Sequence, residues 1–239
     1  MLKNNFKNIK LNEEICEFIG AFIGDGYLGN YGKTKNQYVV AISGDKKLDE
    51  DYLKNYLRPL IQRNFPSTGP KLYYREDENT LMLRVNSKAL YELFLNLGFN
   101  KGKKSDNVKI PQEILNNEEL TKSTVRGIFD TDGCIFLDKR KSYKKPYPRI
   151  TLQLASIDLI NQLEEYLSKN FKLYVNKSNR DGYRNYVEIY GHKQLEKFLK
   201  QIGFSNQRHL SKVKKCLRSI VAIAPGIKIL YIRKTLVLC

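Results

Sequence analysis

Apolar residues near the start of the chain recur at the spacing of one face of an α-helix. Four of them, between Phe18 and Ile23, form this stripe within the segment Asn12–Gly24. Asn12 is placed to cap the helix, and the two glutamates after it lie at the positive end of the helix dipole. The pattern therefore predicts a helix over Asn12–Gly24.

A different pattern, with turn residues between short apolar runs, predicts strands. In the segment Lys71–Val85, Leu81, Leu83 and Val85 alternate with polar neighbours, as expected when one face of a sheet packs on helices and the other is polar. Turn residues divide each such segment into a hairpin. The hairpin segments are Tyr27–Ile42, Lys71–Val85, Cys134–Leu154 and Phe171–Tyr190.

The chain contains the same pattern twice. FIGAFIGDG (Phe18–Gly26) and VRGIFDTDG (Val125–Gly133) align with Asp25 and Asp132 at matching positions, 107 residues apart. A second pair, Asn86–Asn100 and Gly191–Ser205, aligns at an offset of 105 residues. Each half then reads helix, two strands, helix, two strands, helix. We expect an α+β fold of two related αββαββα half-domains, each with one four-stranded antiparallel sheet.

The segment Gly102–Asn117 closes the first half, which places the boundary near residue 118. The expected domains are 12–117 and 118–217, followed by a C-terminal extension of unknown role over 218–239.

Small residues on both motif helices predict that the helices pack closely. Gly20 and Gly24 lie four apart on one helix face, and Gly127 and Thr131 match them in the second copy. Small residues at this spacing allow two helix backbones to approach each other. The two helix C-termini would then meet, with Gly26 and Gly133 ending the helices through a positive φ.

The composition indicates a polyanionic partner inside the cell. The formal net charge is +17, with 42 Lys and Arg against 25 Asp and Glu. The four cysteines form no CxxC pair, and two histidines are too few for a histidine-rich metal site. Neither a signal peptide nor an 18-residue apolar run is evident, so we expect an intracellular protein of the cytoplasm or an organelle.

Asp25 and Asp132 are the best candidates for a metal site. A carboxylate at a helix C-terminus faces the negative end of the dipole unless a cation offsets it, and Mg²⁺ prefers such oxygen ligands. Two other motifs are weaker. GDGYLG (Gly24–Gly29) follows a helix rather than the strand that a dinucleotide site needs, and GFNKGKKS (Gly98–Ser105) is one residue short of a phosphate-binding loop.

The paired motifs, the duplication and the basic hairpins resemble a two-motif LAGLIDADG homing endonuclease over roughly Glu13–Lys215. The resemblance implies motif helices at a pseudo-two-fold interface and a saddle of two sheets that binds the DNA major groove. Hydrolysis of one phosphodiester in each strand would use Mg²⁺, with Mn²⁺ as a substitute, held by Asp25 and Asp132 with Gly24 and Thr131 beside them. An earlier motif acid is present as Asp130 but is replaced by Ile23 in the first copy.

The resemblance also implies a basic residue near the attacking water, after the last helix of a half. Lys104 is the first candidate, next to Lys103, and the duplicated segment aligns Arg208 and His209 with this pair.

Polar hairpin residues, interleaved with tyrosines, are of the types that contact base edges or phosphates. The expected DNA-binding residues are Asn30, Lys33, Lys35, Gln37 and Arg75 in the first half and Lys139, Arg140, Lys141, Arg149, Gln153, Lys177, Asn179, Arg180 and Arg184 in the second.

Both acids in one chain lead us to expect a monomer on a long nonpalindromic DNA duplex. The alternative is a noncatalytic binder on the same scaffold, either an RNA maturase that binds intron RNA or a DNA-binding regulator. An intein is not expected, because the sequence lacks a terminal His–Asn pair and flanking splicing blocks.

Overall fold

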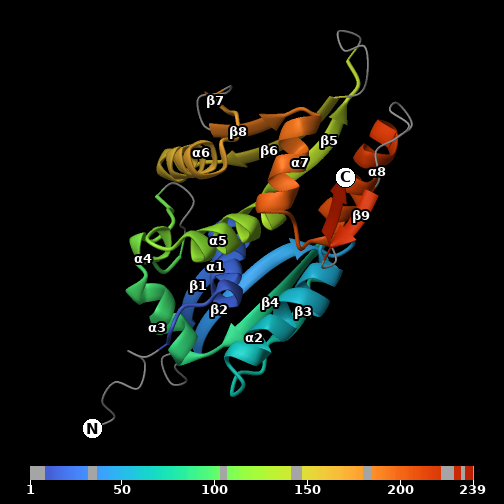
Figure 1. Ribbon diagram of the computed structural model, residues 1–239. Helices are drawn as coiled ribbons and strands as arrows, with labels where there is room; N and C mark the ends of the chain where they lie inside the picture. The colour runs from blue at the N-terminus through green and yellow to red at the C-terminus, as the bar shows by residue number, and fades with distance from the viewer. Residues whose placement is uncertain are drawn as a thin grey trace.

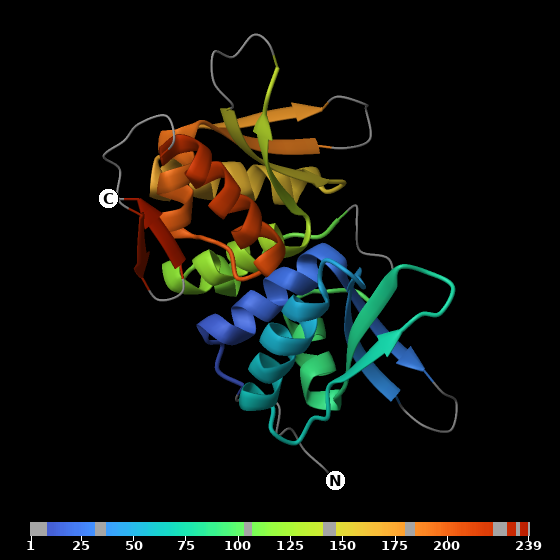
Figure 2. The same ribbon diagram turned by 90° about the vertical axis from the view of Figure 1, so that its right-hand side faces the viewer.

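The computed structural model describes residues 9–31, 37–102, 107–140, 147–179, 185–221, 229–232 and 235–238. Two lobes meet along a central pair of helices, α1 (Glu13–Asp25) and α5 (Glu118–Thr131), which lie side by side (Figures 1 and 2). Asn12 caps α1 as expected, because its side chain accepts a hydrogen bond from the Ile15 amide at 2.8 Å.

The first lobe follows the predicted element order. After α1 come β1 (Gly26–Tyr31), β2 (Gln37–Asp45), a π-helical segment η1 (Tyr52–Leu57) that continues into α2 (Arg58–Asn64), β3 (Lys71–Tyr74), β4 (Thr80–Asn86) and α3 (Lys88–Asn96).

The second lobe repeats this order. After α5 come β5 (Gly133–Asp138), β6 (Tyr147–Leu154), α6 (Ile157–Phe171), β7 (Val175–Asn179), β8 (Asn185–Tyr190) and α7 (His192–Gln201). A short helix α4 (Gln112–Leu115) connects the lobes, and α8 (Gln207–Val221) follows the second. The expected α+β fold of two αββαββα halves is therefore confirmed.

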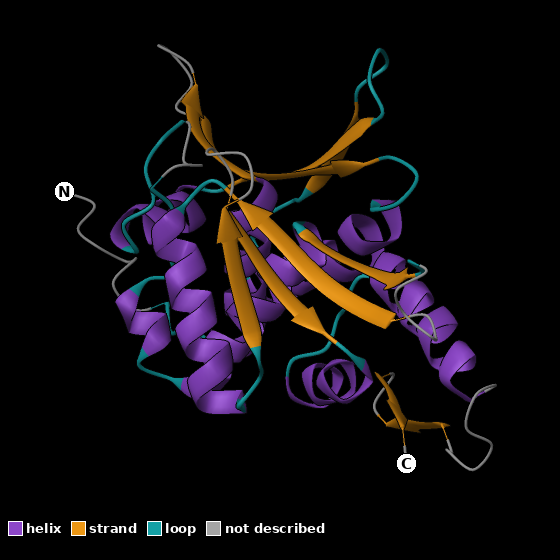
Figure 3. Cartoon of the chain, turned by 90° about the horizontal axis from the view of Figure 1, so that it is seen from above, coloured by secondary structure: helices purple, strands orange, loops and turns teal. Residues whose placement is uncertain are grey.

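Each lobe has one antiparallel sheet, in the orders β1-β2-β4-β3 and β5-β6-β8-β7. The helices (purple) lie beside and beneath the two sheets (orange) in Figure 3. On each sheet, one set of alternating residues is buried against the helices, such as Val40 and Ile42 on β2 and Ile150 and Leu152 on β6. We call the opposite surfaces the first and second open faces.

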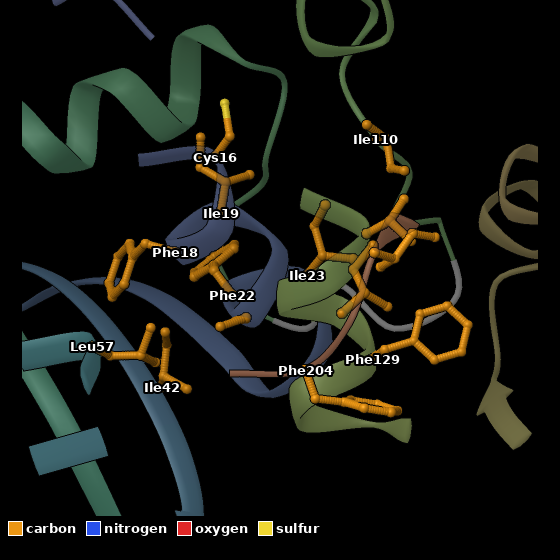
Figure 4. Packing of buried hydrophobic residues seen from close by; sticks show 14 of the residues in the cluster. Cys16, Phe18, Ile19, Phe22, Ile23, Ile42, Leu57, Ile110, Phe129 and Phe204 are labelled. Carbon is orange, nitrogen blue, oxygen red and sulfur yellow. The ribbon is translucent and has the colours of Figure 1, made fainter. Parts of the chain in front are cut away.

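The buried core is continuous through the central helix pair. Ile19, Phe22 and Ile23 of α1 belong to the same cluster as Phe129 of α5 (Figure 4). The cluster also contains residues from two connecting segments between helices. The first connecting segment is 107–117 and the second is 203–206, and they contribute Ile110 and Phe204 respectively.

The glycines after the motif helices do not adopt the positive φ that the sequence suggested. Gly26 has φ −87° and is the first residue of β1, and Gly133 likewise begins β5 and is not among the residues with positive φ. Their role is steric instead. A Cβ on Gly26 would lie 2.4 Å from the Phe22 carbonyl oxygen, and one on Gly133 would lie 2.2 Å from that of Phe129. Glycine is needed because the helix turns directly into a strand.

The boundary expected at residue 217 lies inside α8, which continues to Val221. A hairpin of β9 (Ile229–Ile232) and β10 (Thr235–Leu238) lies in the expected extension, with β10 against α7. Within the described part of the chain, no helix combines the length and hydropathy of a membrane span.

Candidate metal and nucleic-acid site

The central helices touch through their glycines. A Cβ on Gly20 would lie 2.0 Å from the Thr124 carbonyl oxygen, and a Cβ on Gly127 would lie 2.1 Å from that of Glu17. Both distances are well below van der Waals contact, so the two backbones are as close as glycine permits. This agrees with the close packing that the small residues predict.

This contact brings together the ends of the helices that carry the two acids. Asp25 is the last residue of α1 and is exposed, and Asp132 is the C-terminal cap of α5. A Cβ on Gly24 would lie only 2.7 Å from Asp132 Oδ2, so this carboxylate rests against the last turn of α1. Neither helix has a basic residue in its last turn. Two carboxylates thus share the negative ends of two helix dipoles.

This pair of acids fits a hard divalent cation that keeps waters and substrate phosphates as its other ligands. In the parts of the chain that the structure describes, no group of three or more His, Cys, Asp or Glu side chains is placed to hold a metal. The Thr131 carbonyl oxygen accepts a hydrogen bond from Arg208 Nη2 at 2.7 Å and keeps a second lone pair, so its role as a ligand stays a prediction. The Thr131 hydroxyl is directed back to the Gly127 carbonyl at 3.2 Å. The role of Gly24 as a ligand stays a prediction.

The candidates for a basic residue near the attacking water lie in different environments. Lys103 and Lys104 lie outside the described residues. Arg208 points into the interface, where Nη1 donates to Asp49 at 3.0 Å. His209 is fully buried, and burial lowers its pKa to about 3, so its ring is neutral near pH 7. Neither Arg208 nor His209 is directed toward solvent beside the acids.

Sequence reasoning missed Lys212, which approaches the second motif from α8. Its Nζ lies 4.0 Å from the Sγ of Cys134, two residues after Asp132. Cys134 pairs with Thr151 and belongs to the second open face. The helical spacing of α8 does not reveal this approach, since it depends on how α8 crosses the edge of β5.

The first open face contains a hollow of about 360 Å³. Arg84 lies in it and donates to Gln37 Oε1 at 3.0 Å, with its guanidinium 5.8 Å from the Tyr73 ring centroid. Two expected DNA-binding residues, Gln37 and Arg75, line this hollow. Its full lining is Tyr27, Tyr31, Gln37, Val39, Tyr73, Arg75, Met82 and Arg84.

The second open face has a different composition. Arg149 and Gln153 lie on it, and Gln153 Nε2 donates to the Tyr186 hydroxyl at 2.7 Å. Lys139 and Arg140 follow β5 and are exposed. Arg149 pairs there with two acids, Asp138 and Glu188.

Two expected DNA-binding residues lie on the helix-facing side of their sheets rather than on an open face. Asn30 pairs with Tyr38, two residues along the strands from the buried pair of Leu28 and Val40, and so belongs to the helix-facing side of β1. Lys177 pairs with the buried Val187, and its Nζ is 3.1 Å from Glu164 of α6. Successive side chains of a strand point to opposite faces of the sheet, so a shift of one residue changes the face that a side chain occupies. The remaining members, Lys33, Lys35, Lys141, Arg180 and Arg184 with the side chain of Asn179, lie outside the described residues.

Residues 119–203, within the second lobe, match a family model described as a LAGLIDADG-like domain. The fold of most of the chain is shared with solved structures. I-DmoI in complex with DNA and Mn has a TM-score of 0.59 at 19% identity, covering 80% of this chain and 96% of that one. I-WcaI bound to its DNA recognition sequence has a TM-score of 0.56 at 17% identity, covering 88% of each chain.

The same fold occurs in a protein not named as an endonuclease. Full-length DUF199/WhiA from Thermatoga maritima has a TM-score of 0.56 at 13% identity and covers 90% of this chain and 63% of that one.

Curated relatives in Methanocaldococcus jannaschii share long stretches of sequence. A replication factor C small subunit is 32% identical over 96% of this chain, and this chain covers 11% of it. An uncharacterized protein is 28% identical, with 75% of this chain and 65% of that protein covered. Glutamine--fructose-6-phosphate aminotransferase is 25% identical, with 88% and 20% covered. The chain therefore spans less than two thirds of each of these relatives.

The fold has two pseudo-symmetric halves and is shared with the homing endonucleases I-DmoI and I-WcaI. The resemblance expected from the sequence is confirmed: residues 119–203 match the LAGLIDADG-like family model, and most of the chain has the fold of the homing endonucleases I-DmoI and I-WcaI.

Proposed function

We propose that the protein is a site-specific DNA endonuclease that hydrolyses one phosphodiester in each strand of a long asymmetric target. The observation that carries the proposal is the pair of acids at matched helix ends, with Asp132 Oδ2 against the last turn of α1 that ends in Asp25. Two open faces with arginine, glutamine and tyrosine side chains lie beyond this pair and support binding in the major groove.

Asp25 and Asp132 are the residues that would hold divalent cations, for which we propose Mg²⁺ with Mn²⁺ as a substitute. A cation held there would supply Lewis-acid chemistry, polarising the scissile phosphate and lowering the pKa of bound water. The I-DmoI structures contain DNA together with Mn or Ca, and a variant was solved with DNA and Mg. The two acids would hold the metal from helix ends whose spacing is set by the glycine contacts of α1 and α5.

Lys212 is our candidate for the ammonium that contacts a phosphate at the second acid, since it reaches Cys134 beside Asp132. Lys212→Met is expected to slow the cutting of one strand about 100-fold or more, as is typical when one group that stabilises the transition state is removed. The exposed Lys215→Met on the same helix is the matched control. Equal rates on both strands in Lys212→Met would remove this assignment.

A homing role is supported by the relatives. The shared segment makes up 11% of a replication factor subunit and 20% of an aminotransferase, which are proteins of unrelated function. A segment found inside such different proteins is consistent with a mobile coding element.

The noncatalytic alternative is a maturase or DNA-binding regulator, and the fold alone does not decide against it, since DUF199/WhiA shares it. The two acids favour the endonuclease, because a protein that only binds has no need of both.

The test is cleavage selection from a randomised duplex library with Mg²⁺, followed by assays of Asp25→Asn and Asp132→Asn on the selected target. Each variant is expected to retain binding and to lose double-strand cleavage almost completely. Asp158→Asn, an exposed acid in the first turn of α6, is the matched control. Binding without any cleavage by the wild-type protein would favour the alternative.

A further inference from the structure

Two buried acids lie on the second open face, where a polyanion is expected to bind. Glu188 of β8 is 2% exposed and Asp138 of β5 is 8% exposed. Their strand partners, Thr151 and Tyr147, place both side chains on the open side of the sheet. Each carboxylate would repel a DNA phosphate and so weaken binding. Their presence needs an explanation other than affinity.

The partner of both acids is Arg149, in the central strand β6. Its Nε lies 2.9 Å from Asp138 Oδ2, and its Nη1 lies 3.7 Å from Glu188 Oε1. The guanidinium also lies over the Tyr190 ring, 4.8 Å from the centroid. The Arg149 side chain is only 14% exposed. Contacts on two edges and one face therefore fix this guanidinium.

A second set of contacts holds the acids themselves. The Tyr190 hydroxyl donates to Glu188 Oε2 at 3.1 Å and accepts from Asn176 Nδ2 at 2.7 Å. Arg140 Nη2 lies 2.8 Å from Asp138 Oδ2, and its hydrogen bond lowers the pKa of Asp138. The two acids and two arginines carry no net charge, so the cluster adds little attraction for phosphates.

A fixed guanidinium is suited to reading a base. A mobile arginine loses about 2 kcal/mol of rotamer entropy when it is immobilised, whereas a clamped one has lost most of it before binding. Buried ion clusters of this kind contribute little net stability but can fix one geometry. An arginine fork pairs with the O6 and N7 atoms of guanine, the commonest base-specific contact in the major groove.

We propose that Asp138 and Glu188 form a clamp that holds Arg149 in position to read one guanine in the major groove. This inference rests on the proposed function of sequence-specific DNA binding.

The register also places that guanine. Arg149 lies four residues along β6 from Gln153, and Gln153 follows Leu152, the partner of Gly133 beside Asp132. Four residues of a strand span about 13 Å. The guanine read by Arg149 therefore belongs to the part of the target contacted by the second half, away from the second acid along β6.

The experiment is a binding selection from a randomised duplex library in EDTA, with no divalent cation present. Wild-type protein is expected to select a G·C pair at one position in the second half-site. Arg149→Gln should abolish that preference, and Glu188→Gln should reduce it about tenfold, with the rest of the consensus unchanged. Arg75→Gln, in the first half, is the matched control and should leave this position unchanged.

A base preference retained at that position in Arg149→Gln, or lost evenly at all positions, would overturn the clamp while leaving the proposed function intact. A wild-type protein that selects no sequence overturns the proposed function and the clamp together. Circular dichroism checks that each variant folds. If Arg149→Gln does not fold, the Glu188→Gln selection decides, because that substitution keeps the size and shape of the side chain.

Discussion

The two connecting segments occupy equivalent places in the duplicated fold but join the halves by different chemistry. The first uses neutral groups: the Gln162 side chain accepts from the Ile110 amide at 2.8 Å and donates to its carbonyl at 3.0 Å. The second uses a charge, because the Ser205 hydroxyl donates to Glu17 at 2.5 Å. Just beyond it, Arg208 donates to Asp49 at 3.0 Å. Duplication therefore fixed where the halves touch but not the chemistry of the contact.

The central helices explain this difference. Arg126 and Asp130 of α5 align with Ile19 and Ile23 of α1, so the helix pair has charged groups on one side and apolar groups on the other. We call these two sides the charged flank and the neutral flank. Arg126 Nη1 donates to Glu17 at 3.1 Å. Asp130 is fully buried, and burial raises its pKa well above the usual value although it accepts hydrogen bonds from the second connecting segment.

The largest effect is expected from breaking the charged flank at its centre. Glu17 accepts hydrogen bonds from Tyr56, Arg126 and Ser205, and Glu17→Gln places an amide against these three donors. The free energy of unfolding should fall by about 3 kcal/mol, because the partly buried Arg126 loses its anionic partner. Urea denaturation measures it. Glu14→Gln, a half-buried acid on the same helix paired with the exposed Arg63, is the control and should cost less than about 1 kcal/mol.

A smaller loss in the free energy of unfolding is expected from substitutions at the glycine contact between α1 and α5. Gly127→Ala and Gly20→Ala each place a Cβ about 2 Å from a backbone carbonyl oxygen, so the helices must separate. We expect a loss of about 1–3 kcal/mol in thermal or urea unfolding, similar for the two variants. Gly69→Ala, with no atom within 4 Å of its added Cβ, serves as the control. Two unaffected variants would show that the helices are not in the close contact described.

His209 should make the charged flank sensitive to pH. Its pKa is lowered from 6.5 to about 3 by burial, so the unfolded chain binds one more proton between these values. The contribution of His209 to the free energy of unfolding is then fully present above about pH 6.5. It decreases as the pH falls toward 3, and about 2 kcal/mol is lost at pH 5. Urea denaturation at several pH values should show this loss in the wild type and a smaller one in His209→Gln. Identical pH profiles would contradict the prediction.

The smallest effect is expected on the neutral flank. Gln162→Ala removes both hydrogen bonds to Ile110 and should lower the free energy of unfolding by about 1–2 kcal/mol. This loss should be the same at pH 5 and pH 7, since no titrating group takes part in these bonds. A pH-dependent loss would mean that the two flanks are coupled rather than independent.

Much of the fold could be predicted because its signals are local. Helical spacing and the Asn12 cap gave α1, and alternating apolar residues gave β4, within a residue or two of the observed bounds. The repeat indicated two halves and matched Asp25 with Asp132. These features depend on neighbours a few positions away or on simple self-similarity, so they can be read in one dimension.

The sequence by itself thus determined the order of elements, the glycine contact of the central helices and the pairing of the acids. Only the tertiary structure decided which face each strand residue occupies. Val39, Val40, Ala41 and Ile42 are all buried, so alternation could not show that Asn30 faces the helices. It also decided the long-range partners: Ser205 and Glu17 are 188 positions apart, and Lys212 reaches Cys134 across 78. Such contacts follow from how packed elements lie against each other, and no local pattern encodes that arrangement.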